Sequence, residues 1–215
     1  MSEGQPRREA LFPVLPPHGP GLAIGLFGGT FNPPHEGHRL ASLVAMKRLG
    51  LDRVWWIVTP GNPLKDNARL PPLAERMAAA KAVAEHPRID ITGFESAIGT
   101  RFTYDTLAYL RRRCPRTRFV WIMGADNLGT FHRWQNWRAI AALMPIVIVD
   151  RPGATIKAAR APAAVALHSM RMSERSAGAL PGAAPPAWVF LHGPRSAQSS
   201  TALRAQANLP APAMD

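Results

Sequence analysis

Short apolar runs alternate along this chain with longer segments of helical pattern, and this alternation most constrains the fold. The apolar runs predict six strands, at residues 22–27, 53–58, 89–91, 118–123, 146–149 and 188–191. Helical patterns fall at residues 37–49, 72–85, 103–112, 134–143 and 199–206. Most runs are apolar at every position, which is typical of strands covered on both faces in a parallel sheet. The sequence therefore predicts an α/β fold.

The chain of 215 residues suits one domain with short flanking segments. We expect a flexible leader at residues 1–21, a domain at 22–206 and a short tail at 207–215. The leader contains charges and prolines and lacks the apolar segment of a signal peptide. Cys114 is the single cysteine, which excludes an internal disulfide and a cysteine-based zinc site. These features predict a cytoplasmic protein without a membrane span.

The formal net charge of +12 suits either nucleic-acid binding or polyphosphate substrates. The densest basic run, Arg111 to Arg113, follows a helical pattern. Cations are favourable at the carboxyl end of a helix, so we interpret this run as a solvated helix end rather than an RNA-binding patch.

The string GLFGGTFNPPHEGH, at residues 25–38, places two histidines just behind a glycine turn. Glycines let backbone N–H groups approach an anion, and the following helix points its amino end at it. His35 and His38 lie three apart and would face the same side of that helix. They could pack in the core, bind a metal or hold a phosphate. No other clustered His, Cys or acid completes a metal site, so we favour phosphate binding.

Five stretches together resemble the nicotinate-nucleotide adenylyltransferases, a family of the HxGH nucleotidyltransferase superfamily. They are GGTFNPPHEGH at 28–38, TPGNPLK at 59–65, FTYDTL at 102–107, GADNL with FHRW at 124–134, and SSTALR at 199–204. One such motif would identify only the superfamily, whereas all five in order are specific to the family. The resemblance extends over residues 22–204.

The resemblance implies a Rossmann-like, doubly wound parallel sheet in a single domain. It also implies transfer of the adenylyl group of ATP to nicotinate mononucleotide. The products would be nicotinate adenine dinucleotide, an intermediate of NAD biosynthesis, and pyrophosphate. Mg²⁺ would assist, bound mainly through the ATP phosphates, and no protein metal site is expected.

Mapped onto the matching positions, the resemblance assigns His35, His38 and Arg204 to catalysis. These residues would hold the phosphates and stabilise charge, since phosphoryl-type transfer needs positioning more than a nucleophile. By itself, SSTALR reads as a plain helix N-cap. The expected ATP-binding residues are Gly28, Gly29, Thr30, Phe31, His35, His38, Gly124, Asp126, Ser199, Ser200, Thr201 and Arg204.

A second group of residues is expected to bind nicotinate mononucleotide. Trp134 offers a flat face to a pyridine ring, although it could equally be a core residue. Thr103 at a helix start could bind the nicotinate carboxylate. Lys65 could cover a phosphate or lie solvated on the surface. The full group is Asn32, Lys65, Thr103, Asp126 and Trp134.

Three alternatives remain at this level. A related adenylyltransferase would use nicotinamide mononucleotide or pantetheine phosphate instead. A fragment of an aminoacyl-tRNA synthetase would need a late lysine loop, where this chain has SSTALR. An RNA-binding protein would need a clustered basic face. We expect ATP and nicotinate mononucleotide as partners, with no nucleic acid, and the sequence leaves monomer or homo-oligomer open.

Overall fold

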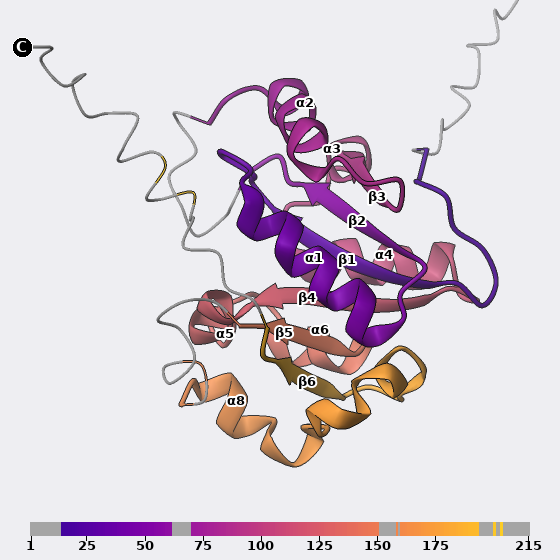
Figure 1. The fold of residues 1–215 in the computed structure, drawn as a ribbon, viewed down its shortest axis with the longest axis vertical. Helices are drawn as coiled ribbons and strands as arrows, with labels where there is room; N and C mark the ends of the chain where they lie inside the picture. The colour runs from indigo at the N-terminus through magenta and orange to yellow at the C-terminus, as the bar shows by residue number, and fades with distance from the viewer. Residues whose placement is uncertain are drawn as a thin grey trace, which may run out of the picture.

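A six-stranded parallel sheet forms the centre of the computed structural model, which describes residues 14–61, 70–150, 158, 160–193, 200 and 203. The strands are β1 (Ala23–Gly29), β2 (Arg53–Val58), β3 (Ile89–Thr92), β4 (Arg118–Gly124), β5 (Ile146–Val149) and β6 (Trp188–Leu191). Their order in the sheet is β3-β2-β1-β4-β5-β6 (Figure 1). This is the doubly wound order of Rossmann folds, so the fold prediction is confirmed.

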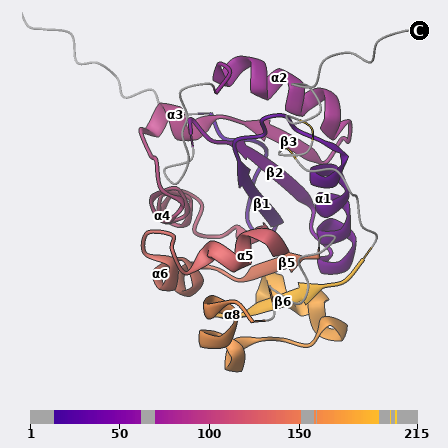
Figure 2. The same ribbon diagram turned by 90° about the vertical axis from the view of Figure 1, so that its left-hand side faces the viewer.

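Helices cover both faces of the sheet (Figures 1 and 2). One face carries α1 (Glu36–Leu49), α2 (Leu73–Ala84) and the 3-10 segment η2 (Glu174–Gly182). The other carries α3 (Phe94–Ile98), α4 (Thr103–Arg113), α5 (Ala125–Phe131), α6 (Trp137–Leu143) and α8 (Pro162–Ala166). A short 3-10 turn, η1 (His168–Met170), follows α8.

Strand β2 explains why the apolar runs are unbroken. Trp55 and Ile57 enter the core on one face, whereas Val54, Trp56 and Val58 enter the core on the other. All five side chains are fully buried. Because successive side chains of a strand point to opposite faces, a sheet covered twice needs apolar residues at every position.

Several short helices differ from the expected pattern. Helix α5 starts directly after β4, where no helix was predicted, and α3 is also additional. Helix α6 begins at Trp137 instead of 134, because Asn136 has a left-handed φ of 56° that ends the preceding turn. Ser200 and Leu203, the described residues of the last expected helix, are helical.

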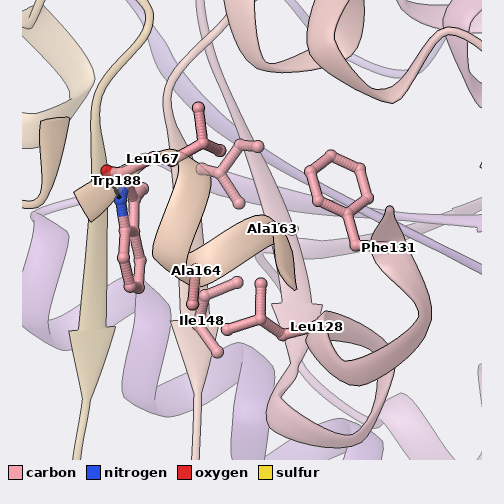
Figure 3. A pocket seen from close by; sticks show the side chains of 8 residues that line it. Leu128, Phe131, Ile148, Ala163, Ala164, Leu167 and Trp188 are labelled. Carbon is pink, nitrogen blue, oxygen red and sulfur yellow. Dashed lines mark hydrogen bonds between the residues drawn. The ribbon is translucent and has the colours of Figure 1, made fainter. Parts of the chain in front are cut away.

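The region around residues 160–182, which has no sequence pattern, packs on the edge of the sheet. The Trp188 indole N–H donates a hydrogen bond of 2.7 Å to the Leu167 carbonyl and fastens α8 to β6. A small apolar cavity lies beneath α8 (Figure 3). Its lining residues are Leu128, Phe131, Ile146, Ile148, Ala163, Ala164, Leu167 and Trp188. In the part of the chain that is described, no helix is long and apolar enough to cross a membrane.

Candidate active site

The carboxyl ends of β1 and β4 lie side by side at the point where the strand order reverses. In doubly wound sheets this switch point is where ligands bind. Gly28 and Gly29 end β1, and Gly124 ends β4. Asp126 is exposed in the first turn of α5, directly after Gly124. The fold therefore brings these four predicted residues to one edge of the sheet.

Gly28 also has a packing role that the sequence did not indicate. A Cβ atom on Gly28 would lie 2.5 Å from Cη2 of Trp121 on the neighbouring strand, which is too close for any side chain. A Cβ on Gly29 would make only ordinary contacts, with the ring of Phe31. Gly28 is thus required by the tryptophan beside it, whatever ligand its amide binds.

The loop after β1 is held by a cluster of aromatic rings. Phe31 has a left-handed φ of 47°, an uncommon conformation for a bulky residue. Its side chain is 2% exposed and stacks on Trp56, with ring centroids 4.9 Å apart. The same ring lies 4.9 Å from the His38 ring. The stacking fixes both the strained loop residue and one of the predicted catalytic histidines.

His35 and His38 meet at the start of α1, as predicted from their spacing. Their ring centroids are 3.9 Å apart. The backbone N–H of His35 donates to Nδ1 of His38 at 3.2 Å. An Nδ1 that accepts a hydrogen bond carries no proton, so the neutral His38 ring bears its hydrogen on Nε2. His35 is 3% exposed and His38 is half-buried. Of the two rings, His38 is therefore the more exposed.

Residue 42 secures the turn that carries His38. The Ser42 hydroxyl donates to the His38 carbonyl oxygen at 2.9 Å. The same hydroxyl accepts the Trp56 indole N–H at 2.7 Å. Trp56 therefore supports His38 twice, through Ser42 and through the stacked ring of Phe31.

The SST motif near the end of the chain contacts the loop that precedes the two histidines. The Ser200 hydroxyl donates a hydrogen bond of 2.9 Å to the carbonyl oxygen of Pro33. Two stretches at opposite ends of the sequence thus form one site. Four further predicted residues lie outside the described part of the chain: Lys65, Ser199, Thr201 and Arg204.

Arg76 on α2 is an addition that sequence reasoning missed. It is 3% exposed, and burial lowers the pKa of its guanidinium group. Its side chain donates to the carbonyl oxygens of Thr30 and Thr59 at 2.8 Å and of Pro71 at 2.9 Å. An arginine in an alanine-rich helix has no local signature of such a role.

Two of the residues predicted to bind the mononucleotide lie on the opposite face of the sheet, Thr103 at the start of α4 and Trp134 in the turn between α5 and α6. Thr103 is half-buried and opens α4. Trp134 is half-buried and packs edge-on against Phe131 and Trp121, with centroid separations of 5.4 and 6.5 Å. Trp134 is thus partly a core residue, and its contact with Trp121 connects it to the strand beside Gly28.

A buried acid supports the helix that Thr103 opens. Glu95 of α3 is 7% exposed and accepts a 2.6 Å hydrogen bond from the Thr106 hydroxyl of α4. Burial raises the pKa of Glu95 to about 7, although the Thr106 hydrogen bond acts in the opposite direction. Glu95 was also missed, because a lone glutamate in a short apolar segment has no distinctive spacing.

Other reactive groups lie away from this site. Cys114 is buried and unbonded, and burial raises the pKa of its thiol. The described residues contain no group of three or more His, Cys, Asp or Glu side chains arranged to hold a metal ion.

Comparison with known proteins agrees with this picture. The model of the cytidylyltransferase-like family matches residues 26–206. A probable nicotinate-nucleotide adenylyltransferase of Bradyrhizobium sp. (strain ORS 278) is 64% identical over 153 residues, which are 71% of this chain and 80% of that protein. One of Methylorubrum extorquens (strain PA1) is 58% identical over 185 residues, which are 86% of this chain and all of that protein.

A solved structure shares the fold at much lower identity. It is the Plasmodium falciparum nicotinic acid mononucleotide adenylyltransferase complexed with NaAD, with a TM-score of 0.63 and 15% identity over 86% of this chain and 83% of that chain. The site and fold define a cytidylyltransferase-like nucleotide-binding protein of Rossmann type. Within that class, the chain belongs to the nicotinate-nucleotide adenylyltransferase family.

Proposed function

We propose that this enzyme transfers the adenylyl group of ATP to nicotinate mononucleotide, with the residues around His38 binding the ATP phosphates. A phosphate oxygen of the mononucleotide attacks the α-phosphorus of ATP and forms a new P–O bond. The bond from the α-phosphorus to the oxygen that bridges the α- and β-phosphates breaks, and pyrophosphate leaves with that oxygen. Nicotinate adenine dinucleotide, an intermediate of NAD biosynthesis, is the other product.

The observation that carries the proposal is the hydrogen bond from the His35 backbone N–H to Nδ1 of His38. Its Nδ1 accepts the His35 backbone N–H, so Nε2–H is the group that His38 can donate. A fixed N–H donor in a water-poor site stabilises the negative charge that grows on phosphate oxygens during the transfer. The buried His35 ring packs against that donor, with the two ring centroids 3.9 Å apart.

Further donors surround the same position. The amides of Gly28 and Gly29 lie at the end of β1, those of Thr30 and Phe31 follow it, and Ser200 lies against Pro33. Gly124 gives the nucleotide close access to the end of β4, and Asp126 accepts hydrogen bonds from ribose hydroxyls. Ser199, Thr201 and Arg204 belong to the motif that contains Ser200, and Arg204 would hold the departing pyrophosphate.

The pyridine nucleotide occupies the side of the site formed by α4 and α5. The first-turn amide and hydroxyl of Thr103 bind the nicotinate carboxylate, since an anion is stabilised at a helix amino end. Trp134 contacts the ring, and Asn32 and Lys65 contact the remainder of the mononucleotide. Mg²⁺ accompanies the ATP phosphates, because this ion is commonly held by substrate phosphates and water. It would neutralise phosphate charge.

The test is a direct assay with a matched control. The purified protein is incubated with ATP, Mg²⁺ and either nicotinate or nicotinamide mononucleotide, and pyrophosphate and dinucleotide are measured. We expect strong preference for the acid and loss of about 10²–10³-fold in turnover for His38→Ala. His168→Ala, at an exposed histidine of η1, should retain wild-type rates.

Two results would revise the proposal. Equal rates with nicotinate and nicotinamide mononucleotide would show that Thr103 does not bind the nicotinate carboxylate. Absence of reaction with both nucleotides would reject the substrate assignment and make pantetheine phosphate the next compound to test.

A further inference from the structure

We propose that Arg76 is a positioning residue for ATP, which orients the backbone amide of Phe31 by holding the carbonyl group of Thr30. This inference rests on the proposed function, because it assumes that the Phe31 amide binds ATP. Arg76 itself would not contact the nucleotide. The guanidinium group of Arg76 joins the loops after β1 and β2 to the start of α2.

The argument begins with the cost of burying a charge. Arg76 is 3% exposed, and no carboxylate pairs with it in the described part of the chain. A buried guanidinium group is tolerated only when its N–H groups are satisfied. Here its partners are backbone carbonyl oxygens, with a weaker contact to Pro60 at 3.5 Å. Apolar side chains would fill the same volume without that cost, so the charge serves the loops that it contacts.

The peptide group between Thr30 and Phe31 transmits the effect. This peptide is trans and planar, so its C=O and N–H point in opposite directions. Arg76 Nη1 donates to the Thr30 oxygen at 2.8 Å. The Phe31 N–H is therefore turned away from Arg76 and α2. No acceptor for this N–H is found among the described residues.

The backbone at this position also needs support. Phe31 adopts a φ of 47°, which costs energy in a residue with a large side chain. Stacking on Trp56 holds its ring, and Arg76 holds the peptide group before it. Trp56 and Arg76 together hold Phe31 in a backbone conformation that is unfavourable without them.

The same reasoning predicts which substrate is affected. Arg76 also holds the Thr59 carbonyl in the loop after β2, but residue 60 is a proline and has no N–H to orient. The amide under direct control is that of Phe31, beside the glycines and His38. Loss of Arg76 should therefore weaken the binding of ATP more than the binding of nicotinate mononucleotide.

The experiment compares Arg76→Gln and Arg76→Lys with Arg53→Gln. Arg53 lies at the amino end of β2 and pairs with Asp90 through two hydrogen bonds of 2.7 and 2.8 Å, at the opposite edge of the sheet. We expect Arg76→Gln to raise the KM for ATP roughly tenfold, with a smaller rise for Arg76→Lys and little change for nicotinate mononucleotide. Arg53→Gln should lower Tm and leave both KM values unchanged.

The outcomes separate the two proposals. If Arg76→Gln fails to fold, Arg76→Lys decides. An unchanged KM for ATP in Arg76→Gln (or in Arg76→Lys where Arg76→Gln does not fold), or an equal rise in Arg53→Gln, would overturn the positioning role while the proposed function stands. If the wild-type enzyme forms no dinucleotide, the proposed function fails first and this inference fails with it.

Discussion

The hydroxyl of Ser200 donates a hydrogen bond to the carbonyl oxygen of Pro33, at a distance of 2.9 Å. It joins the loop that precedes the two histidines to the SST motif that follows β6. Both stretches carry predicted phosphate-binding groups, so this bond sets their spacing within the site.

Removing the Ser200 hydroxyl should weaken ATP binding. A hydrogen bond of this kind contributes about 0.5–1.5 kcal/mol, so Ser200→Ala should raise the KM for ATP about 3- to 10-fold. Steady-state kinetics checks this value. Ser173→Ala removes the hydroxyl that caps η2 and should leave the KM unchanged. Equal kinetics for the wild type and Ser200→Ala would show that the bond has no part in spacing the two motifs.

Trp56 and Trp55 offer a matched comparison within one strand. Both are fully buried neighbours in β2. The Trp56 indole N–H donates to Ser42, whereas that of Trp55 has no acceptor among the described residues. Trp56→Phe should therefore destabilise the fold by about 1 kcal/mol more than Trp55→Phe, measured by urea unfolding. It should also lower kcat/KM, because Ser42 holds the turn of His38. Equal losses in the two variants would contradict this account.

Gly28→Ala tests the close approach of β1 and β4. The added Cβ would lie 2.5 Å from the Trp121 ring, and such overpacking costs about 1–3 kcal/mol. Gly129→Ala is the control, because its Cβ would meet nothing within 4 Å inside helix α5. That substitution should be neutral or stabilising by up to about 1 kcal/mol. Thermal melts of both variants decide, and a Gly28→Ala protein as stable as the wild type would refute the packing role.

Glu95 should make stability depend on pH. Burial raises its pKa from 4.5 to about 7, so the folded state binds the proton more tightly than the unfolded state. The stability that the protonated group provides is complete below about pH 4.5 and is lost as the pH rises to about 7. Glu95→Gln should remove this loss. Between pH 4.5 and 8 the variant should gain about 3 kcal/mol relative to the wild type, measured by urea unfolding.

Glu174 is the control for that pH series. Burial favours its protonated form, but hydrogen bonds from His192 and the charge of Arg48 outweigh burial and lower its pKa. The stability that ionised Glu174 provides is therefore lost as the pH falls. Glu174→Gln should lose stability relative to the wild type with rising pH, which is the opposite sign to Glu95→Gln. A pH-independent difference for Glu95→Gln would show that Glu95 does not titrate as described.

The local sequence pattern was sufficient to predict the sheet and the edge of the sheet where the candidate site lies. All six strands were expected within two residues of their observed ends, because a run such as residues 53–58 is apolar throughout. Parallel strands place all their carboxyl ends together, so the grouping of Gly28, His38 and Gly124 followed from the order of elements. The family followed from five motifs and is confirmed by the relatives.

The remainder depends on contacts between distant segments. Helix α5 has seven residues that include a glycine, too short for a helical period to emerge. Arg76 and Glu95 gain their roles only through burial against loops and helices that follow or precede them by many residues. No local spacing encodes such partners, so only the folded chain reveals them.

The strand order also bears on how the chain is synthesised. Strand β1 lies in the middle of the sheet, where residue 23 pairs with residue 118 of β4. On the ribosome the first three strands emerge with one side of β1 open and an apolar face uncovered. Pairings between residues so distant form slowly, and unpaired edges of this kind promote aggregation. We therefore expect the nascent first half to be the stage at which this chain is most prone to aggregation.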